Sequence, residues 1–182
     1  MKKFRLYYDK DKEEKWLNRM CEKGWAMTGF FMGVYTFESC EKSEYIYRID
    51  MPGEIGKSSI RDGKAREYIS FVEETGAEYV CTWGWWVIFR KKASAGNFEL
   101  YTDTESQIAL YRRIQKLFLW GGLLEIIMGI NNTLIYLSKN RIDAFDIAML
   151  VLIYLLMAVF LVGIIKTTIK IKKLKEKSLL TK

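Results

Sequence analysis

A long uncharged apolar run near the C-terminal end constrains this chain more than any other feature. The run is Ile147–Ile165 (IAMLVLIYLLMAVFLVGII), and its 19 residues include no Asp, Glu, Lys or Arg. About 20 helical residues cross the hydrocarbon core of a bilayer. A buried helix of a soluble protein is the alternative, but such helices rarely extend this far without a polar face. We therefore predict a transmembrane helix at 147–165.

A second, weaker apolar span precedes it at Leu117–Leu137 (LFLWGGLLEIIMGINNTLIYL). Its large apolar residues contribute roughly −0.3 to −0.6 kcal/mol each to insertion, whereas a charge near the centre, here Glu125, costs roughly +2.5 to +3.5 kcal/mol. The connection between the spans, residues 138–146, is short. We therefore expect the two spans to insert together as a hairpin.

The net charge of +7 lies almost entirely at the C-terminal end. Residues 1–116 contain 20 Lys and Arg against 18 Asp and Glu, while residues 166–182 contain seven Lys against one Glu. A basic segment directly after a membrane span is typical of binding to anionic lipid headgroups, at about 1 kcal/mol per lysine. We assign this contact, rather than nucleic-acid binding, to Lys166, Lys170, Lys172, Lys173 and Lys175.

The bases on either side of the spans also predict an orientation. Arg112, Arg113 and Lys116 precede the first span, and the lysine tail follows the second. The positive-inside rule then places both termini in the cytoplasm and the loop at 138–146 outside. The first ten residues, MKKFRLYYDK, contain no apolar signal-peptide core, so we expect the front domain to stay in the cytosol with Cys21, Cys40 and Cys81 reduced.

Residues 1–92 have the pattern of an α+β domain. We expect helices beginning at a capping box at Asp11–Glu14 and at Ser59, each ended by a glycine, Gly24 and Gly76. Their apolar faces are Trp16, Leu17, Met20 and Cys21 in the first helix, and Ala65, Tyr68, Ile69 and Val72 in the second. The expected strands are Phe4–Tyr8, Trp25–Thr28 with a break or bulge at Gly29 and Gly33, a hairpin of Val34–Ser39 with Tyr45–Asp50, and Glu78–Trp83 with Trp85–Lys91.

These elements favour a ferredoxin-like βαββαββ arrangement, in which one antiparallel sheet carries both helices on the same face. Residues 93–116 form the linker and a juxtamembrane helix. A second capping box at Thr102–Glu105 begins that helix, which can continue unbroken through Arg113 into the first span.

Four groups of residues resemble a bacterial family known as domain of unknown function 2812. They are YDKDKEEKWLNRMCEKGW at Tyr8–Trp25, YTF at Tyr35–Phe37, the strand YIYRID at Tyr45–Asp50, and FELYTD at Phe98–Asp103. The resemblance covers roughly residues 1–115 and implies a membrane-anchored cytoplasmic module of unassigned activity. Its genes are often found beside PadR-like transcriptional regulators, which implies a link to regulation or sensing. The family assigns no catalytic residue that can be transferred.

Two sets of side chains in the front domain are candidate ligand or partner contacts. The first is a set of aromatic residues that could line a pocket, with the core of a small domain as the alternative. Trp85 and Trp86 are adjacent in the chain and should face opposite sides of a strand. The second is a polar site at Glu38, Arg48 and Asp50, with a surface ion pair as the alternative. The candidate binding residues are Trp16, Trp25, Tyr47, Arg48, Trp83, Trp85 and Trp86.

Inside the predicted hairpin, Glu125 is the residue with most functional interest, because an ionisable group near mid-membrane is a functional candidate by default. Gly121, Glu125, Gly129 and Thr133 recur every four residues and form a small, polar stripe. Tyr154 is at a similar depth in the second span, so a Glu125–Tyr154 contact or pairing of Glu125 across a dimer is one hypothesis. A protonated Glu125 that only packs the hairpin is the other.

These patterns favour a membrane-anchored regulatory module that binds a protein partner or ligand. The alternative is an accessory subunit, or a homo-oligomer, assembled through the Gly121, Glu125 and Gly129 face. The chain contains no histidine, no P-loop and no dinucleotide-binding glycine pattern, so we expect neither an enzyme nor a metal or cofactor site.

Overall fold

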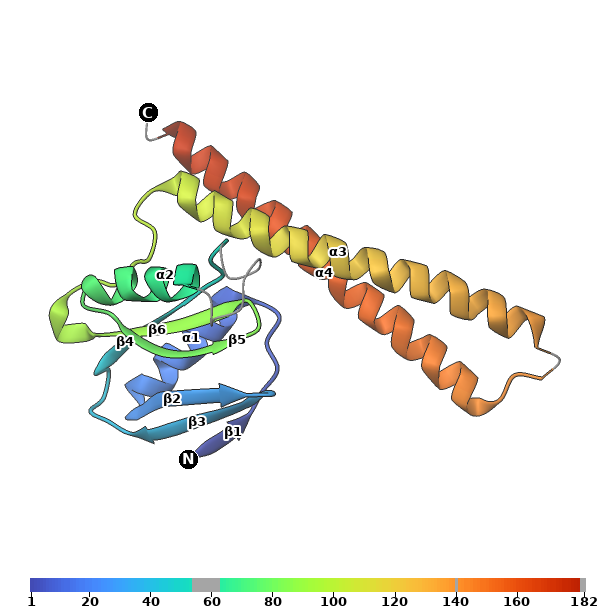
Figure 1. Ribbon diagram of the computed structural model, residues 1–182, viewed down its shortest axis with the longest axis horizontal. Helices are drawn as coiled ribbons and strands as arrows, with labels where there is room; N and C mark the ends of the chain where they lie inside the picture. The colour runs from blue at the N-terminus through green and yellow to red at the C-terminus, as the bar shows by residue number, and fades with distance from the viewer. Residues whose placement is uncertain (54–62, 140, 181–182) are drawn as a thin grey trace. The chain divides into compact units, whose positions relative to one another are not determined.

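The computed structural model describes residues 1–53, 63–139 and 141–180 of the 182-residue chain (Figure 1). It divides into two compact units, Met1–Asp103 and Thr104–Lys182. The first is an α+β domain and the second is a helical hairpin, as predicted.

The domain contains six strands and two helices in the order β1 α1 β2 β3 β4 α2 β5 β6. Their bounds are β1 (Lys2–Phe4), α1 (Lys10–Glu22), β2 (Trp25–Phe31), β3 (Val34–Ser39), β4 (Tyr45–Asp50), α2 (Gly63–Glu74), β5 (Glu78–Trp83) and β6 (Trp86–Lys92), followed by the short 3-10 helix η1 (Ala93–Ala95). The strands form two antiparallel sheets of three, in the orders β1-β3-β2 and β4-β6-β5. All six strands predicted by residue range form, but the βαββαββ order has only five strands, and the six strands form two sheets rather than one.

The expected hairpin of β3 with β4 does not form. Both edges of β3 are already occupied, by β1 on one side and β2 on the other, so β4 pairs with β6 in the second sheet. The first strand also differs from the prediction, because it covers Lys2–Phe4 rather than Phe4–Tyr8. Phe4 pairs with Val34, the first residue of β3, so the residues after Phe4 have no strand left to pair with.

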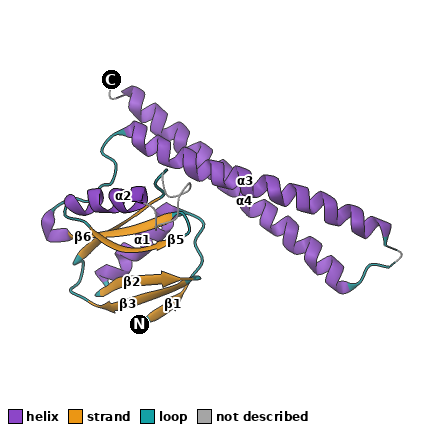
Figure 2. Cartoon of the chain, in the orientation of Figure 1, coloured by secondary structure: helices purple, strands orange, loops and turns teal. Residues whose placement is uncertain are grey.

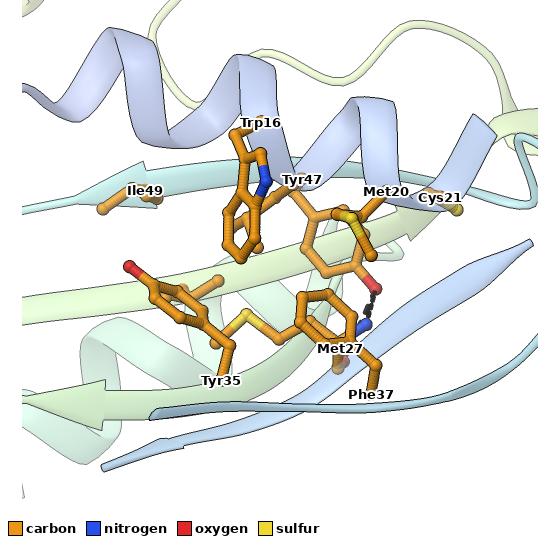
Figure 3. Packing of buried hydrophobic residues seen from close by; sticks show 10 residues of the cluster. Trp16, Met20, Cys21, Met27, Tyr35, Phe37, Tyr47 and Ile49 are labelled. Atoms are coloured by element: carbon orange, nitrogen blue, oxygen red, sulfur yellow. Dashed lines mark hydrogen bonds between the residues drawn. The ribbon is translucent and has the colours of Figure 1, made fainter. Parts of the chain in front are cut away.

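The two sheets and α1 share one hydrophobic core (Figure 3). Trp16, Leu17, Met20 and Cys21 are all buried on α1, as the helical spacing predicted. The helix begins after Asp9, whose side chain accepts a hydrogen bond from the Lys12 N–H, and not at the predicted capping box two residues later. The remaining buried members of the core come from β2, β3, β4 and β6, and they are Met27, Tyr35, Phe37, Tyr47, Ile49 and Ile88.

The helix α2 covers the other face of the β4-β6-β5 sheet (Figure 1). A second core lies between that face and α2. The sheet separates the two cores, and successive side chains of β6 point to opposite faces. Ile88 packs in the first core, whereas Val87 and Phe89 pack in the second. The helices therefore lie on opposite faces of this sheet rather than on one. Val72 of α2 is buried in the second core, with Tyr68 and Ile69 packed against it. The predicted helix start at Ser59 and the side chain of Ala65 lie outside the described residues.

The second unit consists of two long antiparallel helices, α3 (Thr104–Ser138) and α4 (Ala144–Leu180) (Figure 2). Both predicted spans lie within them, and α3 continues unbroken through Arg113 into its apolar part, as expected. Both helices are long and apolar enough to cross a membrane, and only 11% of the residues in the most apolar window of each are buried. The core helix of a soluble protein would be mostly buried, so these helices expose their apolar side chains in the way that lipid-facing helices do.

Candidate functional site

Large apolar side chains are exposed together at the end of the domain where β2 turns into β3 and β5 turns into β6. We call this group the aromatic surface; it consists of Phe4, Leu6, Phe31, Met32, Trp83 and Trp85, which are between 41% and 77% exposed. The rings of Phe31 and Trp83 are 5.5 Å apart, centroid to centroid, and join the two turns. Phe4 and Leu6 lie over Gly33, where an added Cβ would be 2.8 Å and 3.0 Å from their side-chain carbons.

Tight turns place these side chains at the tips. Met32 and Gly33 between β2 and β3 both have positive φ, +44° and +81°, and Gly84 between β5 and β6 has φ +56°. Two-residue hairpin turns of this kind favour Asn and Gly, and other residues adopt positive φ at a cost. Met32 therefore occupies a position where a short polar residue would be more stable, and its long apolar side chain points into solvent.

The structure divides the predicted aromatic set between core and surface. Trp16 and Tyr47 are buried, and Trp25 and Trp86 are packed against the same core, so none of these four lines an open site. Trp83 and Trp85 are exposed. Trp85 lies in the turn rather than in β6, because β6 begins at Trp86.

The polar trio predicted at Glu38, Arg48 and Asp50 does not assemble. Arg48 donates to the carbonyl oxygen of its neighbour Tyr47 at 3.0 Å, and Glu38 lies 3.7 Å from Arg90. Asp50 instead faces α2, because the even-numbered residues of β4 point toward the second core.

Asp50 forms the centre of a buried polar cluster that links three parts of the domain. Its carboxylate is fully buried and accepts a hydrogen bond from the Tyr68 hydroxyl at 2.5 Å. The Tyr101 hydroxyl donates to both carboxylate oxygens, at 2.9 Å each. Burial, together with the adjacent carboxylate, raises the pKa of Tyr68, so its hydroxyl remains a donor at neutral pH.

This cluster, which we call the Asp50 pin, fixes the end of the domain. Tyr101 lies three residues before α3 begins, and Phe98 is buried in the second core just upstream. The segment that leads to the helical hairpin is therefore held to the domain by both apolar packing and hydrogen bonds. Sequence reasoning noted Asp50 but missed both tyrosines as its partners.

The thiols and carboxyls of the first core have the properties of structural groups. Burial raises the pKa of Cys81 to about 11 and that of Cys40 to about 11, so both thiols are protonated at neutral pH and are poor nucleophiles. Burial also raises the pKa of Glu13, which accepts a hydrogen bond from the Tyr35 hydroxyl at 2.6 Å. Within the parts of the chain that the structure describes, no three Cys, Asp or Glu side chains gather as a metal site requires.

The small-residue stripe on α3 faces α4 and lies inside the hairpin. A Cβ at Gly121 would overlap the ring of Phe160, and one at Gly129 would lie 3.4 Å from Met157. The face that the accessory-subunit hypothesis needs is therefore covered within this chain. Oε2 of Glu125 is buried without a hydrogen-bond partner.

The Tyr154 hydroxyl lies 3.1 Å from the Thr133 hydroxyl, two turns of α3 beyond Glu125. The predicted contact between Glu125 and Tyr154 assumed that similar depth brings the two side chains together. Helical side chains tilt toward the N-terminus of their own helix. In an antiparallel hairpin, the tips of Glu125 and Tyr154 therefore diverge.

The predicted headgroup-binding lysines lie on the last turns of α4, which stays helical to Leu180. Lys172, Lys173 and Lys175 are exposed, whereas Lys166 and Lys170 are partly buried. The Lys170 ammonium lies 5.1 Å from the centre of the Tyr111 ring on α3, so this lysine also holds the hairpin together.

Comparison with known proteins places the chain in one family. No curated protein and no solved structure matches it. Residues 9–123 match the family described as Protein of unknown function (DUF2812), which covers more than half of the chain, from the N-cap of α1 into α3. The earlier resemblance is thereby confirmed, and the chain belongs to the DUF2812 family.

Proposed function

We propose that this protein is a membrane-anchored cytoplasmic regulatory module that binds a protein partner or ligand through its aromatic surface. The observation that carries the proposal is that six large apolar side chains are exposed together at one end of the domain. Soluble proteins rarely expose contiguous apolar patches of this kind unless they bind something.

Two further features support the anchored part of the proposal. The helices α3 and α4 are long and apolar enough to span a bilayer, and their flanking bases favour cytoplasmic termini. The Asp50 pin attaches the segment before α3 to the domain. Binding at the domain can therefore be transmitted along the chain to the hairpin. A PadR-like transcriptional regulator is one partner that the family resemblance suggests.

The anchoring is tested first, by fractionating cells that express the full chain. We expect the protein to stay in the membrane pellet after alkaline extraction. We also expect a cysteine-reactive, membrane-impermeant reagent, added to intact cells, to label the Ile142→Cys variant at position 142. The same reagent should not label the Glu74→Cys variant at position 74. Release of the protein by alkali, or labelling at position 74 in intact cells, would reject the proposal.

The binding surface is tested by photo-crosslinking in native membranes. A photoreactive phenylalanine analogue replaces Trp85, and a matched control carries it at Phe71, which is also exposed but lies on α2. We expect a crosslinked species specific to position 85. Equal crosslinking from both positions would show that the aromatic surface has no special role.

A further inference from the structure

We propose that the aromatic surface binds a lipid bilayer: the anionic membrane in which the chain's own hairpin is anchored. The inference rests on the anchoring part of the proposed function and names the ligand of the same surface. It follows from the chemistry of the side chains, from the charge around them and from the length of the tether.

The side chains have the composition of a membrane-interface contact. Tryptophan is enriched where hydrocarbon meets headgroups, because its indole combines an apolar body with a polar N–H. Trp83 and Trp85 supply two indoles at one turn, and Phe31 and Met32 supply apolar side chains at the adjacent turn. Such tips can enter the headgroup region without exposing backbone groups of a strand interior to lipid.

The charged residues next to the aromatic surface in the chain favour an anionic lipid surface. Residues 1–103 contain 17 bases and 17 acids, so the domain as a whole is neutral. The three segments that form the aromatic surface, residues 1–8, 28–37 and 79–89, contain Lys2, Lys3 and Arg5 and no acid. These segments therefore carry +3, while the rest of the domain carries −3. Lys2, Lys3 and Arg5 flank Phe4 and Leu6 in the chain, so this part of the aromatic surface is attracted to anionic lipid.

The tether keeps the surface close to the bilayer. From Thr104 to Lys116, α3 has 13 residues before the predicted span, a length of about 20 Å at 1.5 Å per residue. A tether this short gives the domain an effective concentration at the membrane surface of the order of millimolar. Even weak interfacial binding is then sufficient to keep the domain docked.

Docking gives the proposed module two states. In the docked state, Trp83 and Trp85 are covered by lipid, and in the released state they are free. A factor that lowers the anionic lipid content, or that covers Lys2 and Lys3, shifts the domain toward release.

The test uses the full chain carrying Trp120→Phe, reconstituted into vesicles with and without brominated phospholipid. Trp120 is replaced because it lies within the predicted first span and would be quenched wherever the domain was. In vesicles with anionic lipid, we expect bromolipid to reduce the emission by up to about two fifths, since Trp83 and Trp85 are two of the five remaining tryptophans. Vesicles of neutral lipid should show clearly less quenching.

Two variants, each in the Trp120→Phe background, identify the surface. Trp83→Ser with Trp85→Ser removes the reporters, and Leu6→Glu with Met32→Glu keeps them but adds two acids to the exposed surface. We expect both variants to lose the quenching. We expect the second variant to fold normally, because Leu6 and Met32 are 77% and 64% exposed and contribute little to the core.

The outcomes separate this inference from the proposed function. Failure of the protein to insert would overturn both. An inserted protein whose quenching equals that of the Trp83→Ser, Trp85→Ser variant would overturn the docking alone. Quenching that persists in the Leu6→Glu, Met32→Glu variant or is equal in neutral lipid, or crosslinking from position 85 to a protein rather than to lipid, would also overturn it.

Discussion

Replacing Tyr47 by Phe tests how the two sheets of the domain are joined. Tyr47 lies on β4 and is fully buried, and its hydroxyl accepts a hydrogen bond from the backbone N–H of Met27 at 2.8 Å (Figure 3). The same hydroxyl donates to the Met27 carbonyl oxygen at 3.4 Å. Met27 is on β2, the edge strand of the other sheet. One phenol therefore bonds to both backbone groups of Met27 and joins β4 to β2 of the other sheet.

The expected cost follows from the buried N–H that the substitution leaves behind. A buried donor without a partner destabilises a protein by about 1–3 kcal/mol, because it has lost water and gained nothing in exchange. Phe has nearly the same shape as Tyr, so little packing is lost. For a domain of this size, 1 kcal/mol shifts the Tm by about 4–8 °C, so a cost of about 1–3 kcal/mol predicts a fall of about 4–24 °C.

Thermal unfolding of the full chain in detergent micelles, followed by near-ultraviolet circular dichroism, measures this change. Tyr79→Phe is the matched control, since it removes a hydroxyl that is exposed and lies 3.1 Å from Thr82. We expect that control to change the stability by less than about 0.5 kcal/mol. Equal Tm values for Tyr47→Phe and Tyr79→Phe would refute the role of the Tyr47 hydroxyl as the joint between the sheets.

Three further predictions concern the hairpin and the first core. Gly121→Leu should separate α3 from α4, because even a Cβ at this position overlaps Phe160, and a lower Tm of the hairpin in micelles would show it. Glu125→Gln should leave the hairpin folded; an unchanged oligomeric state and cellular phenotype would then reject a functional role for the carboxyl. Burial raises the pKa of Glu13 above its unfolded value of 4.5, so ionised Glu13 destabilises the fold. The domain therefore becomes more stable as the pH falls through the pKa of Glu13 in the folded state. Glu13→Gln, which keeps an acceptor for Tyr35, should therefore raise the Tm at pH 8 more than at pH 4.5, and an equal shift at both pH values would contradict this reasoning.

The fold illustrates what local sequence patterns can predict and what they cannot. The helix over Lys10–Glu22 and its buried face follow from spacing alone, since one helix determines which of its side chains share a side. The pairing of strands does not, because it depends on which edges are free in the assembled domain. The chain segment between Val34–Ser39 and Tyr45–Asp50 is short enough for a hairpin. The pairing of β1 with β3 removes that option.

The aromatic surface was predictable in part. Trp83 and Trp85 attract attention as tryptophans around a glycine, whereas Phe31 and Met32 did not. The signal for these two was present in the run Phe30–Met32, in which three consecutive apolar residues break the alternation of a strand with one wet face. In such a run at least one side chain must point to solvent. Phe30 packs on the core, and the other two are exposed.

The Asp50 pin shows why a site residue can be noticed in the sequence and still be misread. Its position on one face of β4 with Arg48 suggested an ion pair, but a surface ion pair gains little and does not need burial. A fully buried carboxylate needs several donors, and these come from α2 and from the segment before α3, 18 and 51 residues further along the chain.

The family match spans residues 9–123 and so includes Asp50, Tyr68 and Tyr101 together with the first part of α3. Ordering a linker costs about 1–2 kcal/mol per residue in backbone entropy. A linker that served only as a flexible connection would therefore not need to be fixed to the domain. The buried Phe98 and the hydrogen bonds of Tyr101 offset that cost, and they make the attachment to α3 part of the domain's core rather than an appendage to it.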